Sequence, residues 1–133
     1  MGSKSDYLAN KIMDHMLGGG DYTRPATVYV ALFTVTPGEA GGGTEVTGGS
    51  YARVAVTNNA TNFPASLYQG KSNATTITFP TATADWGTIV GTALFDASTA
   101  GNMLFWSALN ASKVVSNGDV FRFQDDDLVF TED

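Results

Sequence analysis

Apolar residues recur with two different periods along this chain of 133 residues. Close to the N-terminus they follow helical spacing, at Leu8, Ile12, Met13, Met16 and Leu17. Ser3 or Ser5 can cap such a helix at its start, and the glycines at residues 18–20 can end it. We therefore predict one amphipathic helix of about three turns. Its apolar face must pack on its own sheet or on a neighbouring subunit, because so short a helix is marginally stable alone.

From residue 27 onward, apolar and polar residues alternate in short runs separated by glycines, which is typical of β-strands. The runs predict seven or eight strands, at residues 27–35, 51–57, 74–79, 88–95, 103–109, 114–115, 120–123 and 128–131. The first run is apolar on both faces, so it predicts a central strand covered on both sides. Asn117-Gly118 is a strong turn signal before the run at 120–123. The whole pattern predicts a mainly β fold, an antiparallel β-sandwich or barrel with one N-terminal amphipathic helix.

The length favours a single domain over residues 1–133, with the helix and its glycine-rich cap at 1–20 and the β-sandwich at 21–133. One segment of it, residues 38–49, is rich in glycine and includes Gly41, Gly42 and Gly43. It contains no basic residue, so it does not resemble a phosphate-binding loop. Two interpretations stay open: a contact arm that becomes ordered on a partner, or a mobile loop.

Few residues in this chain are suited to catalysis. The sequence has no cysteine and a single histidine, His15, and charged residues make up only 15% of it. We therefore expect no catalytic residues and no cofactor, and a structural or binding protein rather than an enzyme. The net charge of −6 disfavours nucleic acid as a partner. No apolar run approaches the roughly 20 residues needed to span a membrane.

Two clusters are candidates for a binding site. Asp125, Asp126 and Asp127 form the densest acidic run, which can hold a hard cation such as calcium or can be a solvated turn. Three aromatic residues, Tyr51, Tyr68 and Trp86, can stack on sugar rings or can pack in the core and in subunit contacts. Trp86 follows Asp85 at an expected turn, which suggests a position near the surface.

Seven segments spread over nearly the whole chain share a pattern with one known family. They are residues 4–8, 24–33, 41–46, 49–53, 77–87, 95–97 and 128–133. The most specific stretch is FPTATADWG at residues 79–87. In these segments the chain resembles a family of small tailed-bacteriophage virion proteins, described as Gp80-like and often labelled phage tail fibre protein. The resemblance implies a structural part of the phage particle, and it implies no catalytic residues.

The residues and the resemblance together lead to one expected function and one alternative. We expect a capsid decoration (cement) protein on the outside of the phage head, made in the cytoplasm of the bacterial host. It would form a homo-oligomer, expected to be a trimer, and bind the major capsid protein. Its expected contact residues are Leu8, Ile12 and Met16 of the helix and the glycines of the loop. The alternative is a tail or tail-fibre component that contacts host glycans and other tail proteins.

Overall fold

The computed structural model describes residues 2–132, and in these residues one helix accompanies ten strands. The elements are β1 (Ser3–Lys4), α1 (Asp6–Met16), β2 (Thr27–Val35), β3 (Thr44–Glu45), β4 (Val54–Thr57), β5 (Gly70–Ser72), β6 (Ile77–Thr78), β7 (Gly87–Phe95), β8 (Met103–Val115), β9 (Arg122–Phe123) and β10 (Val129–Thr131). All pairs between these strands are antiparallel. The predicted class, mainly β with one N-terminal helix, is confirmed.

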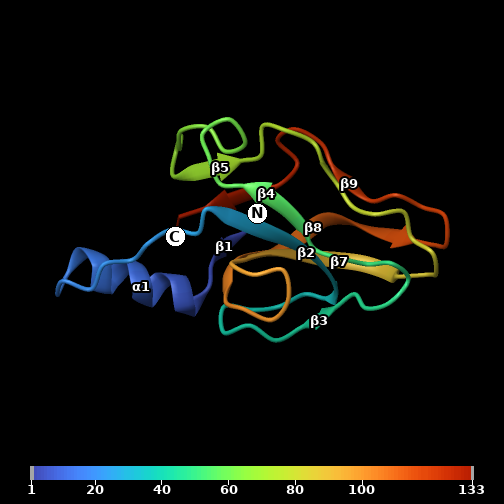
Figure 1. Cartoon of the computed structure of the whole chain (residues 1–133), viewed down its shortest axis with the longest axis horizontal. Coiled ribbons are helices and arrows are strands. Elements are labelled where there is room, and N and C mark those ends of the chain that lie inside the picture. The colour runs from blue at the N-terminus through green and yellow to red at the C-terminus, as the bar shows by residue number, and fades with distance from the viewer. Residues whose placement is uncertain (1, 133) are drawn as a thin grey trace.

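Six strands form the main sheet, in the order β1-β8-β7-β2-β3, with β4 also paired to β2 (Figure 1). Strand β2 has the predicted bounds, and it lies inside the sheet between β7 and the pair β3 and β4. Its side chains alternate between two apolar clusters, so Val30 and Leu32 belong to one and Ala31 and Phe33 to the other. The prediction of a central strand with two apolar faces is therefore confirmed.

The larger apolar cluster lies between the main sheet and a second layer made of two short ribbons, β6 with β9 and β5 with β10. Ile77, Phe79, Phe123 and Phe130 of that layer pack in the same cluster as Leu32 of the main sheet. Each ribbon pairs only two or three residues per strand, and loops complete the layer. The second layer is thus not one continuous sheet, and the predicted sandwich or barrel is not confirmed.

Helix α1 begins where the sequence predicts it. Ser5 is the N-cap, and its hydroxyl oxygen accepts a hydrogen bond from the backbone N–H of Leu8 at 3.2 Å. The helix ends at Met16, and Gly18 and Gly19 follow with φ of 111° and 90°. Only its first turns contact the sheet, so its C-terminal end projects from the body (Figure 1).

The second half of the chain departs from the prediction in two places. The runs at 103–109 and 114–115 are one long strand, β8, which is out of regular register with β7 between Lys113 and Ala108. A turn does form at Asn117-Gly118, where the N–H of Asp119 donates to the Ser116 carbonyl at 2.9 Å. However, β9 pairs with β6 and not with β8, because the chain crosses to the other layer after the turn.

Candidate functional site

The glycine-rich loop is more ordered than either interpretation of its sequence requires. Strand β3 forms inside it and pairs with β2, and Val46 is buried in the core. Gly41, Gly42 and Gly43 all have a positive φ, of 98°, 80° and 73°. A Cβ on Gly43 would lie 2.5 Å from the carbonyl oxygen of Val35, whereas Gly41 and Gly42 face open space. Only Gly41 and Gly42, of the three predicted contact glycines, are therefore free to meet a partner.

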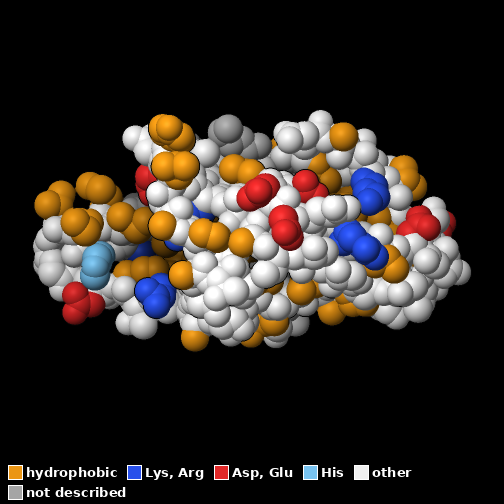
Figure 2. Space-filling view, turned by 90° about the horizontal axis from the view of Figure 1, so that it is seen from above, with side chains coloured by type: hydrophobic (Ala, Val, Ile, Leu, Met, Phe, Trp, Pro, Cys, Tyr) orange, Lys and Arg blue, Asp and Glu red, His pale blue; other side chains and the backbone are white. Residues whose placement is uncertain are grey.

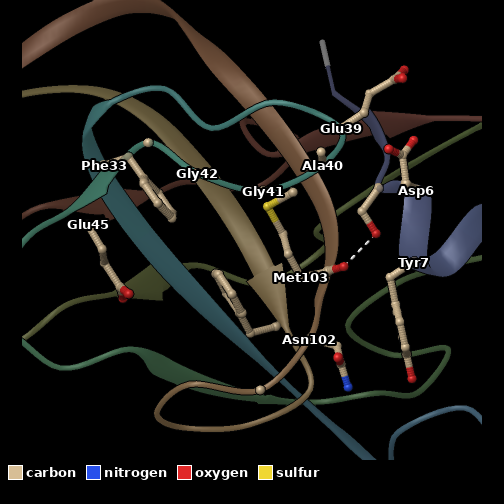
Figure 3. A pocket seen from close by; sticks show the side chains of 14 residues that line it. Asp6, Tyr7, Phe33, Glu39, Ala40, Gly41, Gly42, Glu45, Asn102 and Met103 are labelled. Atoms are coloured by element: carbon tan, nitrogen blue, oxygen red, sulfur yellow. Dashed lines mark hydrogen bonds between the residues drawn. The ribbon is translucent and has the colours of Figure 1, made fainter.

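A cleft of about 440 Å³ lies between this loop, the N-terminus of α1 and the main sheet (Figure 3). Phe33 and Met103 line its inner side, and Asp6 and Glu39 lie along its rim. The N–H of Asp6 donates to the Glu39 carbonyl at 2.8 Å, which holds the loop against the start of the helix. The cleft thus joins the two predicted contact elements, the helix and the loop, at one place on the surface.

One charged network braces the far side of this cleft. Arg53 donates through Nε and Nη2 to both carboxylate oxygens of Glu45 at 2.9 Å, and through Nη1 to the carbonyls of Ala97 and Ala100. Its guanidinium lies 3.7 Å from the centre of the Phe95 ring. The network therefore ties β3 to the loop that follows β7, a role the sequence analysis did not assign to Arg53.

Tyr51 completes the network from the core side. Its hydroxyl donates to Glu45 Oε2 at 2.7 Å and accepts from the N–H of Leu32 at 3.0 Å. Burial and the hydrogen bond to Glu45 both raise the pKa of this phenol above its usual value, so Tyr51 is neutral over the physiological range. Tyr51 is therefore a structural residue, since its hydroxyl is used within the fold and its partly buried ring packs against the core.

Trp86, which was predicted to lie on a sugar-stacking surface, lies in the core instead. It is buried, its indole N–H donates to the Gly49 carbonyl at 2.9 Å, and its ring meets that of Tyr51 edge-on with centroids 5.4 Å apart. The expectation that Trp86 lies near the surface is wrong, because no turn follows Asp85: Trp86 directly precedes β7, and its ring packs in the core. Tyr68, with 92% of its surface exposed, is the one predicted glycan contact that a sugar can reach.

The three aspartates of the acidic run do not converge. Asp127 accepts from the N–H of Gln124 at 2.9 Å, Asp126 accepts from the Ser72 hydroxyl at 2.6 Å, and Asp125 lies 3.5 Å from the hydroxyl of Thr76. Within residues 2–132, no three His, Asp or Glu side chains are grouped so that they can hold a metal ion. The arrangement fits a solvated turn, which was the alternative interpretation of this run.

The predicted apolar stripe of α1 divides into two parts. Leu8 is buried in the chain's own core, and Ile12 packs partly against it. Met16 is 69% exposed, and so is Leu17 beyond it. Leu8 is therefore wrong as an intersubunit contact, because the helix packs on its own sheet at that point, while Met16 is still free for a partner.

Comparison with known families adds a finding that covers nearly the whole molecule. A family model described as "Podophage GP4 fiber I protein gp80" matches residues 3–131. The chain belongs to this family. The comparison with curated proteins finds no match. The resemblance stated from the sequence is thus confirmed, and the chain is a structural protein of the phage virion.

The stretch at residues 79–87, the most specific part of the family resemblance, is a core segment. Phe79 and Trp86 are buried at its two ends, and Ala82 is buried between them. The Tyr51 ring lies against both aromatic rings, stacked on Phe79 and edge-on to Trp86. In this chain the stretch therefore serves packing in the core. No helix in residues 2–132 is long and apolar enough to cross a membrane.

Proposed function

We propose that this chain is a non-enzymatic structural subunit of the phage fibre apparatus. The observation that carries the proposal is the match of residues 3–131 to a family that is described as a fiber protein. The contacts around the cleft support it, since the polar groups of Arg53, Glu45 and Tyr51 form hydrogen bonds that hold loops against the sheet. A subunit of this kind acts by shape and by burial of surface rather than by turnover.

The capsid decoration role expected from the sequence stays a prediction, and it differs from the fibre role in location. In both roles the chain acts as a homo-oligomer, with a trimer as the expected form, and binds other virion proteins of the head or the tail. Many equivalent copies would give a firm attachment even where each contact is weak. Contact with host glycans, if the fibre makes it, would rest on Tyr68 and not on Tyr51 or Trp86.

Location in the particle tests the proposal. We would reconstruct the virion and compare it with particles in which this chain carries a small added domain on the exposed turn at Asn117. Extra density at the tail, in a few copies, is the expected result. Extra density spread over the head in hundreds of copies would support the decoration role and refute the fibre role. Particles that lack the chain would refute a structural role of either kind.

A further inference from the structure

Two apolar surfaces lie next to each other at the α1 end of the molecule. The first is the α1 tip, which we define as Met13, Met16 and Leu17. These side chains are 58%, 69% and 69% exposed, and they are close together in the sequence at the helix end. Hydrophobic atoms gather at this projecting end in the space-filling view (Figure 2). Exposed apolar side chains that cluster in this way mark a contact surface.

The second surface is the α1 groove, a hollow of about 840 Å³ beside the root of the helix. Core residues Val28, Leu94 and Leu104 lie along its floor, and the partly exposed Phe63 and Phe105 lie along its walls. Its volume is at the upper end of the range for ligand sites, so it can admit several apolar side chains. Leu8 borders it, which places the groove beside the first turns of α1.

We propose that the α1 tip of one copy of this chain occupies the α1 groove of a second copy. The helix cannot insert its tip into its own groove. Eight residues separate Leu8 at the groove from Met16 at the tip, which is a distance of about 12 Å along a rigid helix that leads away from the body. Tip and groove lie at the same end of each molecule, so two or three copies can exchange tips in a closed arrangement.

Charge favours the same occupant. Asp14 and Asp21 flank the tip and its following turn, with Asp21 Oδ1 3.9 Å from His15 Nδ1 of the same chain, whereas Arg24 and Lys71 line the groove. Glu132 also lines the groove, but it forms an ion pair with Lys4 of the same chain. A docked tip would therefore bring two carboxylates of one copy toward two basic side chains of the other. An anionic lipid surface fits less well, because the two aspartates beside the tip would repel it.

The inference rests on the homo-oligomer proposed above and names the surfaces that build it. The first test replaces Met16 and Leu17 together by glutamine, which removes the two most exposed of the three apolar side chains of the tip without adding charge to the helix end. The control is Val114→Gln, since Val114 is similarly exposed, at 63%, on β8. Sedimentation velocity should detect an oligomer for the parent chain and the control. In the double variant the dissociation constant of the oligomer should rise by at least about 100-fold. Its circular dichroism spectrum should be unchanged, which shows that the fold is intact.

The second test maps the contact directly, and it is simplified by the absence of native cysteine. A chain with Met16→Cys is mixed with an isotope-labelled chain with Ala65→Cys, because Ala65 lines the groove. Oxidation should form the mixed disulfide between labelled and unlabelled chains. A labelled chain with Asn117→Cys, on the distant turn after β8, should form much less of it. Mass spectrometry of the cross-linked products measures the yield of the mixed disulfide in each of the two mixtures.

Three results would overturn the inference. They are a monomeric parent chain, an oligomer that the Met16 and Leu17 substitutions leave intact, and mixed disulfides no more frequent with Ala65→Cys than with Asn117→Cys. A groove filled instead by an apolar small molecule or by lipid, with the chain monomeric, overturns it as well. A monomeric parent chain would also contradict the homo-oligomer of the proposed function, whereas an intact oligomer or unselective disulfides would refute the tip-and-groove contact alone. An oligomer built through tip and groove but absent from phage particles would refute the fibre proposal alone.

Discussion

Tyr51 joins three parts of the fold through one side chain. Its ring packs between Phe79 and Trp86 of the family-specific stretch, and its hydroxyl bridges Glu45 of β3 and the backbone of β2. A largely buried phenol that both donates and accepts a hydrogen bond is costly to ionise. The stability of the protein should therefore depend on the protonation of this residue.

The first prediction concerns stability at alkaline pH. The folded-state pKa of Tyr51 is raised above the unfolded value of about 10, so its stabilisation is complete below that pH. Above it, the unfolded chain loses the proton first, and the free energy of unfolding falls by up to about 1.4 kcal/mol per pH unit from this group. Tyr51→Phe should be less stable at neutral pH and should lose less stability between about pH 10 and 11.

Urea titrations at several pH values measure this effect. Tyr68→Phe is the matched control, because it removes a phenol hydroxyl from a fully accessible side chain. The pKa of Tyr22 is also raised, by burial and by its neighbours Tyr7 and Asp96. Tyr22 therefore also lowers the free energy of unfolding at alkaline pH, and part of the pH dependence should remain in Tyr51→Phe. An alkaline slope for Tyr51→Phe as steep as that of the parent chain would contradict the prediction.

The second prediction separates two neighbouring glycines. Gly42 and Gly43 both have a positive φ, so alanine at either position should cost about 1 kcal/mol of strain. Alanine at Gly43 should cost clearly more, because its Cβ would also meet the backbone of Val35 and Pro37. Thermal unfolding of the two single variants measures the difference. Equal losses would mean that β3 can shift away from β2 without penalty.

At the scale of elements, α1 combines two functions in eleven residues. Its first half packs on the sheet through Leu8, and its second half exposes Met13 and Met16. We therefore expect Leu8→Ala to lower the free energy of unfolding by about 2–5 kcal/mol, as for other buried leucines. Met16→Ala should change it by less than about 0.5 kcal/mol when measured on the monomer.

Denaturant unfolding at low protein concentration measures both changes without interference from self-association. The comparison is matched because the two residues lie on the same helix and both substitutions leave alanine, a good helix former. A small effect of Leu8→Ala would mean that the helix is only loosely attached to its own sheet. In that case Leu8 would be available as an intersubunit contact, as the sequence analysis had predicted.

The elements themselves show where the sequence was informative. Local patterns predicted the helix, a serine cap at residue 3 or 5, the bounds of β2 and its two apolar faces, because propensity and alternation are local properties. The partner of β9 depends on the path of the chain between layers, and no local signal encodes it. The brace between Arg53 and Glu45 was missed for the same reason, since it exists only where β3 folds back on β2.

At the scale of candidate sites, the sequence gives residue types but not exposure. Tyr51, Tyr68 and Trp86 look equivalent as aromatic residues in loop-rich surroundings, yet Trp86 is buried, Tyr51 is partly buried and Tyr68 is exposed. Burial is decided by contacts between segments far apart in the chain, such as the hydrogen bond from Trp86 to Gly49. The same holds for Asp125 to Asp127, whose side chains separate because each bonds to a different backbone or hydroxyl group.

At the scale of the whole molecule, one layer is a continuous six-stranded sheet and the other is divided into two short ribbons. Strand β2 is paired along both edges, and β7 lies between β2 and β8, so their amides are held in long ladders. The ribbons on the other side pair only a few residues each, although their aromatic side chains fill the core. The two layers share one apolar cluster but differ in how many backbone hydrogen bonds protect them.

This difference predicts two levels of hydrogen exchange. Amides at the centre of β2 and β7, such as those of the register partners Ala31 and Ala93, should exchange only when the whole protein unfolds. Amides at the β6–β9 ribbon, such as that of Phe79, which directly follows β6 and donates to the Phe121 carbonyl, should exchange faster through local opening. Opening the ribbon breaks few hydrogen bonds, but it exposes Phe79 and Phe123. The difference in opening free energy between the two sets of amides should therefore be modest, and it should shrink when a low concentration of urea is added. Equal protection of both sets would mean that the ribbons and the main sheet form one cooperative unit.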